Sequence, residues 1–211
     1  MEGSHSAHGQ PPQIRQAIAE RSPSLRYFLL DASALVSYYC GDEPGEIRAR
    51  VAELFARHSE GAAFLYVPNF CVTEVLRSMA KKCWTEKKGD PDPDSAFHTF
   101  KETFLTDIRN AKILYSYELT RRHILLSDEI YKTAATMSTR QGHNPGAFDL
   151  LIIAMGLDLA QIHGQDNLYI VTADAGLADV CNKDTKSFPK AFNIAKSNLP
   201  KSLFVSREVS P

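Results

Sequence analysis

The sequence predicts an α/β domain whose parallel sheet carries helices on both faces. Short apolar segments typical of buried strands recur along the chain, segments with helical periodicity separate them, and no tight-hairpin signal joins two of them. Strands separated by helices pair in parallel, because the helix carries the chain back across the sheet. A chain of 211 residues is long enough for one substantial core and short for two.

The chain divides into an N-terminal extension, residues 1–25, and one domain, residues 26–211. The extension opens with small polar residues rich in Gly and His, which resemble in part an engineered leader. Within it, residues 13–20 have the pattern of a short helix that Pro23 ends. The remainder shows no internal repeat, so one domain with an insertion near 85–104 accounts for it.

Strands and helices alternate through the first half of the domain. Residues 27–30 are apolar and precede Asp31, which is typical of a buried parallel strand. Apolar residues within 46–58 recur at i, i+4, i+7 and i+8, the spacing of one helix face. The expected elements are a strand at 26–31, helices at 33–39 and 46–58, a strand at 62–67 and a helix at 69–84.

An exposed loop and a second series of elements follow. Residues 85–95 combine Lys, Gly, Asp and Pro as surface loops do. Ser127 is expected to cap one helix, and Asn144 with Pro145 to begin another that runs to His163. The expected elements are a helix at 97–108, an extended stretch at 113–119, a helix from Ser127 to Met137, a helix at 145–163, a strand at 168–171, a helix at 175–181 and a strand at 202–205.

Composition narrows the class of protein. A formal net charge of −1 argues against a protein that coats nucleic acid by bulk charge. The 4 cysteines show no CxxC spacing, so buried reduced thiols are favoured over a zinc site. The longest apolar stretch, 147–160, carries two acids and is too short to span a bilayer. We therefore expect a soluble, cytoplasmic protein with no membrane contact.

Two acidic residues follow predicted strands. Asp31 ends the first strand, and Asp174 comes just after the strand at 168–171. Ligands of open parallel sheets gather outside the carboxyl ends of the strands, so both positions suit contact with a metal or a phosphate. Each residue also suits the N-cap of the helix that follows.

Two further acids lie in early turns of helices. Glu74 falls one turn into the helix at 69–84, where an ordinary exposed glutamate is the alternative. Asp149 interrupts an almost wholly apolar helix, which is typical of a helix buried on most sides. A buried carboxylate is unfavourable unless it is paired or binds a metal, although the helix dipole offsets part of that cost.

Together the four acids predict a metal site. Clustered carboxylates repel one another and take up protons unless a cation neutralises them. A set of oxygen ligands selects hard cations such as Mg²⁺ or Mn²⁺. Such ions activate water, orient a phosphodiester and stabilise the departing oxygen. The predicted chemistry is therefore metal-dependent hydrolysis of phosphodiesters.

Four short motifs, in order along the chain, resemble the PIN-domain family and more narrowly its VapC-type toxin ribonucleases. The motifs are Asp-x-Ser at Asp31 and Ser33, Pro-Asn-x₄-Glu-Val-x-Arg from Pro68 to Arg77, Phe-Asp-Leu-x₂-Ile-Ala from Phe148 to Ala154, and Val-Thr-Ala-Asp from Val171 to Asp174. The resemblance implies a Rossmann-like three-layer sandwich, a Mg²⁺ or Mn²⁺ site and endonucleolytic cleavage of RNA. It also implies a small antitoxin partner and a homodimer.

The resemblance assigns roles to particular residues. Asp31, Glu74, Asp149 and Asp174 take the acidic positions that bind metal and catalyse, Ser33 and Thr172 match hydroxyl residues that orient them, and Asp179 matches an additional acid. The extension before residue 26 and the longer path between Glu74 and Asp149 depart from small toxin members. These departures bear on the toxin role and the RNA target more than on the chemistry.

A basic strip follows Glu74 on the same predicted helix. Arg77, Lys81 and Lys82 lie where they could guide an RNA backbone to the acids, although a solvated helix end has the same composition. Trp84 and the phenylalanine stripe within 97–104 suit core packing or a partner interface better than base stacking.

Two alternatives to a toxin ribonuclease stay open. One is an RNA-processing or decay nuclease outside any toxin pair. The other is a catalytically silent module in which the fold serves to bind a partner. A phosphoaspartate enzyme is disfavoured, because Asp31 is followed by Ala-Ser and no Asp-x-Asp pair is present there.

Overall fold

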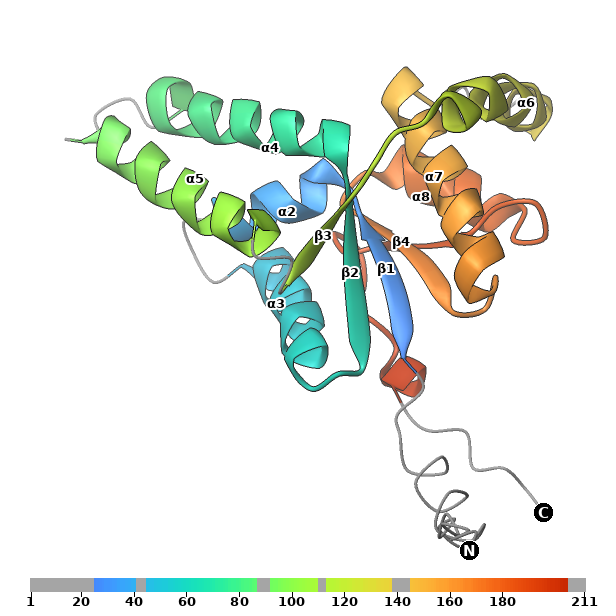
Figure 1. Ribbon diagram of the computed structural model, residues 1–211, viewed down its shortest axis with the longest axis horizontal. Helices are drawn as coiled ribbons and strands as arrows, with labels where there is room; N and C mark the ends of the chain where they lie inside the picture. The colour runs from blue at the N-terminus through green and yellow to red at the C-terminus, as the bar shows by residue number, and fades with distance from the viewer. Residues whose placement is uncertain (1–24, 41–44, 87–91, 110–112, 138–144, 205–211) are drawn as a thin grey trace, which may run out of the picture.

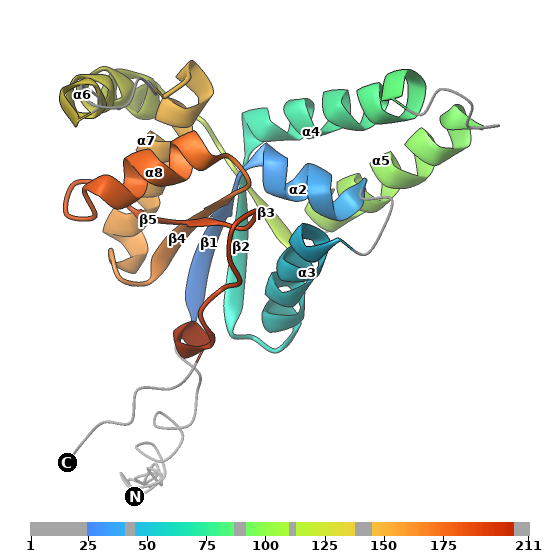
Figure 2. The same ribbon diagram turned by 180° about the vertical axis from the view of Figure 1, so that it is seen from behind.

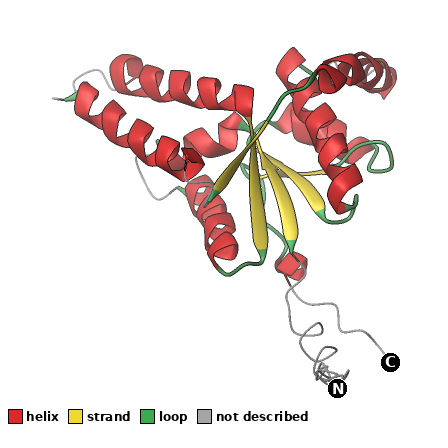
Figure 3. Cartoon of the chain, in the orientation of Figure 1, coloured by secondary structure: helices red, strands yellow, loops and turns green. Residues whose placement is uncertain are grey.

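The computed structural model describes residues 25–40, 45–86, 92–109, 113–137 and 145–204. These residues form one sheet of five parallel strands in the order β3-β2-β1-β4-β5, drawn as yellow arrows in Figure 3. The strands are β1 (Arg26–Leu30), β2 (Ala63–Pro68), β3 (Leu114–Tyr117), β4 (Leu168–Thr172) and β5 (Lys190–Asn193). The predicted α/β class is therefore confirmed.

Helices connect successive strands, as the sequence pattern predicts. They are α2 (Ala32–Tyr39), α3 (Glu46–Ser59), α4 (Asn69–Lys81), α5 (Pro93–Arg109), α6 (Arg121–Met137), α7 (Ala147–His163) and α8 (Ala175–Lys183), with a π-helical turn η1 (Lys82–Glu86) and a 3-10 turn η2 (Lys201–Phe204). The predicted insertion at 85–104 covers the end of η1 and most of α5. None of the described helices is long and apolar enough to cross a membrane.

The helices form layers on the two faces of the sheet. Figure 1 shows α7 in front of the strands, with α6 packed on it, and the reverse view in Figure 2 shows α2 and α8 in front. Helices α4 and α5 extend together beyond the β3 edge. The arrangement is the Rossmann-like three-layer sandwich that we expected.

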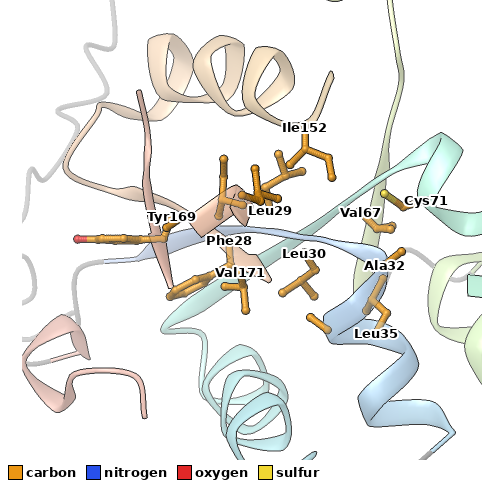
Figure 4. Close-up of a cluster of buried hydrophobic side chains, with 14 of the residues drawn as sticks. Phe28, Leu29, Leu30, Ala32, Leu35, Val67, Cys71, Ile152, Tyr169 and Val171 are labelled. Atoms are coloured by element: carbon orange, nitrogen blue, oxygen red, sulfur yellow. The ribbon is translucent and has the colours of Figure 1, made fainter. Parts of the chain in front are cut away.

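The central strand β1 is buried on both faces. Figure 4 shows Leu29 on the side of Ile152 from α7, and Leu30 on the side of Leu35 from α2. All four side chains are at most 1% exposed. A strand covered on both sides is apolar throughout rather than alternating, which explains the continuous run before Asp31. Each such leucine contributes roughly 1.5–3 kcal/mol by leaving water.

Several helix and strand boundaries differ from the prediction. Helix α6 begins at Arg121 rather than Ser127, because Thr120 starts it: the Ile124 N–H donates to the Thr120 carbonyl at 3.3 Å. The hydroxyl of Ser127 donates instead to the Ile124 carbonyl at 2.7 Å, inside the helix. Gly146 is the N-cap of α7.

Other differences lie near the chain ends. The predicted strand at 202–205 is the 3-10 turn η2 over its described residues, and the edge strand β5 stands where no strand was predicted. The predicted helix at 13–20 and the Asn144 cap fall outside the described residues. All four cysteines are buried, and the structure gives them no disulfide, as predicted.

Candidate functional site

The order of the strands brings Asp31 and Asp174 to one place. Strands β1 and β4 are neighbours, and the chain leaves both at the same edge of the sheet. Asp31 follows β1 directly, and Asp174 follows β4 after one intervening residue. Strand order also changes direction between these two strands, because β2 and β3 lie on one side of β1 and β4 and β5 on the other. Such a point is where open α/β sheets bind ligands.

Hydroxyl groups hold the Asp31 carboxylate. The Ser33 hydroxyl and the Thr172 hydroxyl both donate to Asp31 Oδ2, at 2.6 and 2.8 Å. The backbone N–H of Ala173 donates to Ser33 Oγ, and that of Asp174 donates to Thr172 Oγ1, both at 2.9 Å. Since Asp31 is only 8% exposed, this network fixes its orientation. Its Oδ1 accepts no hydrogen bond from any described residue.

Asp31 and Asp174 differ in what they do for the helices that follow them. Both occupy the N-cap position, of α2 and α8 respectively. The Asp174 carboxylate caps α8, because its Oδ1 accepts from the N–H groups of Gly176 and Leu177 at 2.5 and 3.1 Å. The Asp31 side chain makes no capping hydrogen bond. Asp174 therefore caps the helix that follows it, as one alternative predicted, whereas the side chain of Asp31 does not.

Asp149 lies in the first turn of α7, half-buried. Its Oδ2 accepts a hydrogen bond from the Gly146 N–H at 2.8 Å. Burial raises the pKa of this carboxyl; the Gly146 hydrogen bond opposes that rise, and the charges of Asp174 and Asp31 reinforce it. Asp149 therefore lies within electrostatic range of both strand-end acids.

Glu74 approaches the same group from α4. Burial raises its pKa, and the charges of Asp31 and Asp149 raise it further, while Arg77 lowers it. The charge of Asp31 thus acts on both Glu74 and Asp149, and the charge of Asp174 acts on Asp149. Arg77 is the one cation among the causes of these two shifts.

The donor chemistry of these acids suits a hard divalent cation. Each contributes carboxylate oxygens, and like charges brought together are stabilised when a cation lies between them. Asp31, Glu74, Asp149 and Asp174 are the residues that would hold it. As the described side chains stand, no group of three or more His, Cys, Asp and Glu residues is arranged to hold a metal ion. The acids therefore act on one another electrostatically, but their side chains do not form the coordination shell of a metal ion.

The remaining predicted residues lie at different distances from the acids. Arg77 is exposed on α4 beside Glu74. Lys81 pairs with Glu86 at 3.1 Å, and Lys82 reaches toward the Cys40 carbonyl at 3.5 Å. Asp179 lines a hollow between α8 and β5 and is not among the charges that raise the pKa of Glu74 or Asp149. Arg77 therefore acts on Glu74, whereas the site role of Asp179 stays a prediction.

Two aromatic residues beside the acids were not predicted. The rings of Phe70 and Phe148 stack with centroids 5.6 Å apart and an interplanar angle of 23°. Phe148 is 59% exposed and directly precedes Asp149. The sequence around Phe148 is apolar and typical of a buried helix, so it did not indicate that the ring is exposed. The available signal was its place in the first turn, since the first turn of a helix often protrudes from the core.

Comparisons with known proteins give little beyond the architecture. No family model matches the sequence, and no curated protein matches it. A chain of VapBC2 from Rickettsia felis, solved bound to a DNA fragment from their promoter, is 15% identical with a TM-score of 0.43, over 74% of this chain and 94% of that chain. A chain of FitAcB from Neisseria gonorrhoeae is 16% identical with a TM-score of 0.48, over 81% and 99%.

The predicted membership of the PIN-domain family, and of its VapC-type toxins, is therefore corrected. No family model supports it, and the structural neighbours are chains of VapBC2 and FitAcB with too little sequence identity to identify a toxin. The four short motifs were too brief to establish a family.

Proposed function

We propose that this protein is a metal-dependent endoribonuclease that hydrolyses RNA phosphodiesters. One observation carries the proposal: Asp31 and Asp174 lie at the strand-order switch, and their charges raise the pKa of Asp149, while those of Asp31 and Asp149 raise the pKa of Glu74. Such an arrangement destabilises the fold unless a ligand relieves it, and Mg²⁺ or Mn²⁺ is the class of ligand that oxygen donors prefer. When bound, the cation would supply Lewis-acid activation of the phosphodiester and of water.

The surroundings of Asp31, Glu74 and Arg77 suit each residue to a particular role. Asp31 is held rigidly by Ser33 and Thr172 with one oxygen directed away from those hydrogen bonds, which suits a fixed ligand. Glu74 is exposed on α4 and would add a carboxylate to the ligands of the cation. Arg77 is placed to contact a phosphate oxygen of the strand.

A partner-binding module without catalysis is the second candidate. Helices α6 and α7 expose Ile124, Leu125 and Ile162, at 54%, 63% and 64%. Exposed apolar side chains on paired helices are typical of surfaces that other proteins cover. The homodimer and the small protein partner expected from the sequence stay predictions of this second candidate.

Cleavage by matched variants tests the first candidate. We expect the purified protein to cleave a mixed RNA pool with Mg²⁺ or Mn²⁺ and to stop on addition of EDTA. Asp149→Asn should reduce the rate at least roughly 100-fold, because even groups that only support metal ligands contribute up to that amount. Asp128→Asn, which changes an exposed acid on α6, serves as the control.

The outcomes separate the candidates. Equal activity of wild type and Asp149→Asn would reveal a contaminating nuclease and reject the assigned site. Absence of any cation-dependent cleavage, of RNA or of single-stranded DNA, would reject the nuclease and leave the partner-binding module. Preference for DNA over RNA would keep the chemistry and correct the substrate.

A further inference from the structure

We propose that Phe70 and Phe148 form a stacking platform that receives an unpaired base of the bound strand and so restricts the site to single-stranded nucleic acid. The inference rests on the proposed function, since it names the substrate class of the same acidic site. It concerns binding rather than cleavage, which allows the two to be tested separately.

The platform stands directly beside the acids. Phe70 and Glu74 are four residues apart on α4 and therefore share one face of that helix. Phe148 precedes Asp149 in the first turn of α7. The stacked rings thus connect the two helices that bring Glu74 and Asp149 to the carboxyl edge of the sheet.

The exposure of Phe148 distinguishes it from the other phenylalanines. All 11 lie in the described part of the chain, and Phe148 is the single one that is exposed. Phe28 and Phe104 are 0% exposed, whereas Phe148 is 59% exposed. Phe148 stacks on Phe70 with part of its surface and leaves the remainder to solvent. What sets Phe148 apart from other exposed apolar residues is that its ring is stacked on Phe70 next to Asp149, which leaves a supported aromatic surface open to a ligand.

Base stacking would supply binding affinity that the charges around the acids do not. The formal net charge is −1, so bulk charge supplies little attraction for a phosphate backbone. Arg77 is the one cation among the charges that shift the pKa of Glu74 and Asp149. Affinity therefore has to come partly from uncharged contacts. A base stacked on an aromatic ring contributes about 1–3 kcal/mol and requires no particular sequence.

Stacking also selects the form of the nucleic acid. The faces of bases inside a duplex are covered by their neighbours, so a fixed ring can reach only a base that is unpaired or displaced. A base held on Phe148 places its own phosphate next to Asp149 and Glu74. The platform would therefore position the scissile bond as well as add affinity.

Binding to oligonucleotides that contain 2-aminopurine tests the platform. We would use the Asp149→Asn protein, in which the strand stays intact, and compare Phe148→Ala, Phe148→Leu and Phe148→Tyr within it. Ile162→Ala is the control, since Ile162 is 64% exposed on the same helix but near its other end. Circular dichroism and thermal unfolding would check that each variant folds.

We expect a ring at position 148 to be required. The parent and Phe148→Tyr should quench 2-aminopurine in a single strand, and Ile162→Ala should do the same. Phe148→Ala and Phe148→Leu should lose the quenching and bind the single strand about tenfold more weakly, within the range for one stacked base. Duplex RNA should give no quenching with any of them.

Three results would overturn the proposal. Unchanged binding and quenching in Phe148→Ala would leave the ring as a contact for another protein. Equal affinity of Phe148→Leu and the parent would show that apolar area, rather than an aromatic face, matters. Quenching of a base within an intact duplex would remove the selection for single strands. If quenching follows the expected pattern while the wild type cleaves nothing, the platform stands and the nuclease proposal fails.

Discussion

Helix α7 carries two aspartates, Asp149 and Asp158, whose pKa values shift in opposite directions. At Asp158 burial would raise the pKa, but hydrogen bonds from Tyr117 and His123 and the charge of Arg122 lower it overall. At Asp149 burial raises the pKa, and the nearby charges of Asp174 and Asp31 add to the rise. The same residue type on the same helix therefore meets opposite environments.

The partners of Asp158 explain its role. Its Oδ2 accepts from the Tyr117 hydroxyl at the end of β3 and lies 3.3 Å from Nε2 of His123, which is 1% exposed. Its Oδ1 pairs with Arg122 at 3.0 Å. The Asp158 cluster therefore joins β3, α6 and α7 through one satisfied carboxylate. Among the described residues, the Gly146 N–H is the one hydrogen-bond donor to the Asp149 carboxylate, and the charges of Asp174 and Asp31 act on it. A carboxylate with few described partners therefore marks the candidate site.

Stability measurements provide the largest expected difference between the two aspartates. Asp158→Ala leaves the buried ring of His123 and the hydroxyl of Tyr117 without their acceptor, and should lower the free energy of unfolding by about 2–3 kcal/mol. The exposed Arg122 contributes little to that figure because solvent screens its pair. Asp149→Asn removes repulsion and should change stability by less than about 0.5 kcal/mol. Urea denaturation of both variants measures this.

A comparable loss of stability in the two variants would contradict the contrast between Asp149 and Asp158. It would mean that Asp149 is a structural residue of α7 like Asp158. The folded fraction of Asp158→Ala should keep its cleavage activity, whereas that of Asp149→Asn should not.

Thr172→Val tests the support of the acidic site with a smaller effect. The substitution keeps the volume of a fully buried side chain but removes the donor to Asp31 and the acceptor of the Asp174 N–H. We expect a loss of about 1–2 kcal/mol in stability and a roughly tenfold slower cleavage. Tyr117→Phe, which removes one donor to Asp158, is the matched change in the other cluster and should leave cleavage unaffected. Slower cleavage in both would indicate a general effect of stability.

Most of the fold follows from local signals in the sequence. Strands β1 and β4 are buried on both faces, so their apolar runs identify them without knowledge of the rest of the molecule. β5 was not predicted, because Lys190–Asn193 is short and lies at the sheet edge, where its pairing with β4 makes it a strand. The start of α6 was misplaced because Thr120 and His123 contact each other there, and no common capping pattern pairs these residue types.

The site was predictable in part for the same reason. The positions of Asp31 and Asp174 follow from the ends of strands, which are visible in the sequence. The proximity of Glu74 and Asp149 depends on how α4 and α7 pack, which periodicity alone does not give. The exposure of Phe148 depends on the same packing. The family inferred from four brief motifs was not supported, because no family model matches the sequence.

The dependence of stability on pH gives the smallest and most diagnostic difference. The folded pKa of Asp149 is raised above its ordinary value of 3.8, so the folded state holds this proton more tightly than the unfolded state. Stability should therefore fall as pH rises from about 4 through the raised pKa, and Asp149→Asn should lose that part of the slope. Since Asp149 is only half-buried, screening should keep the difference below about 0.5 kcal/mol.

Asp158 should behave in the opposite way. Its folded pKa is lowered, so its contribution is fully present above its ordinary value of 3.8 and is lost as pH falls through the folded-state pKa. Denaturation of wild type, Asp149→Asn and Asp158→Asn between pH 3 and 7 would show both slopes.

Mn²⁺ should stabilise the wild type more as pH rises, because the cation replaces the proton among the acids. A gap between wild type and Asp149→Asn that stays constant with pH would show that Asp149 is not under the repulsion on which the metal site depends.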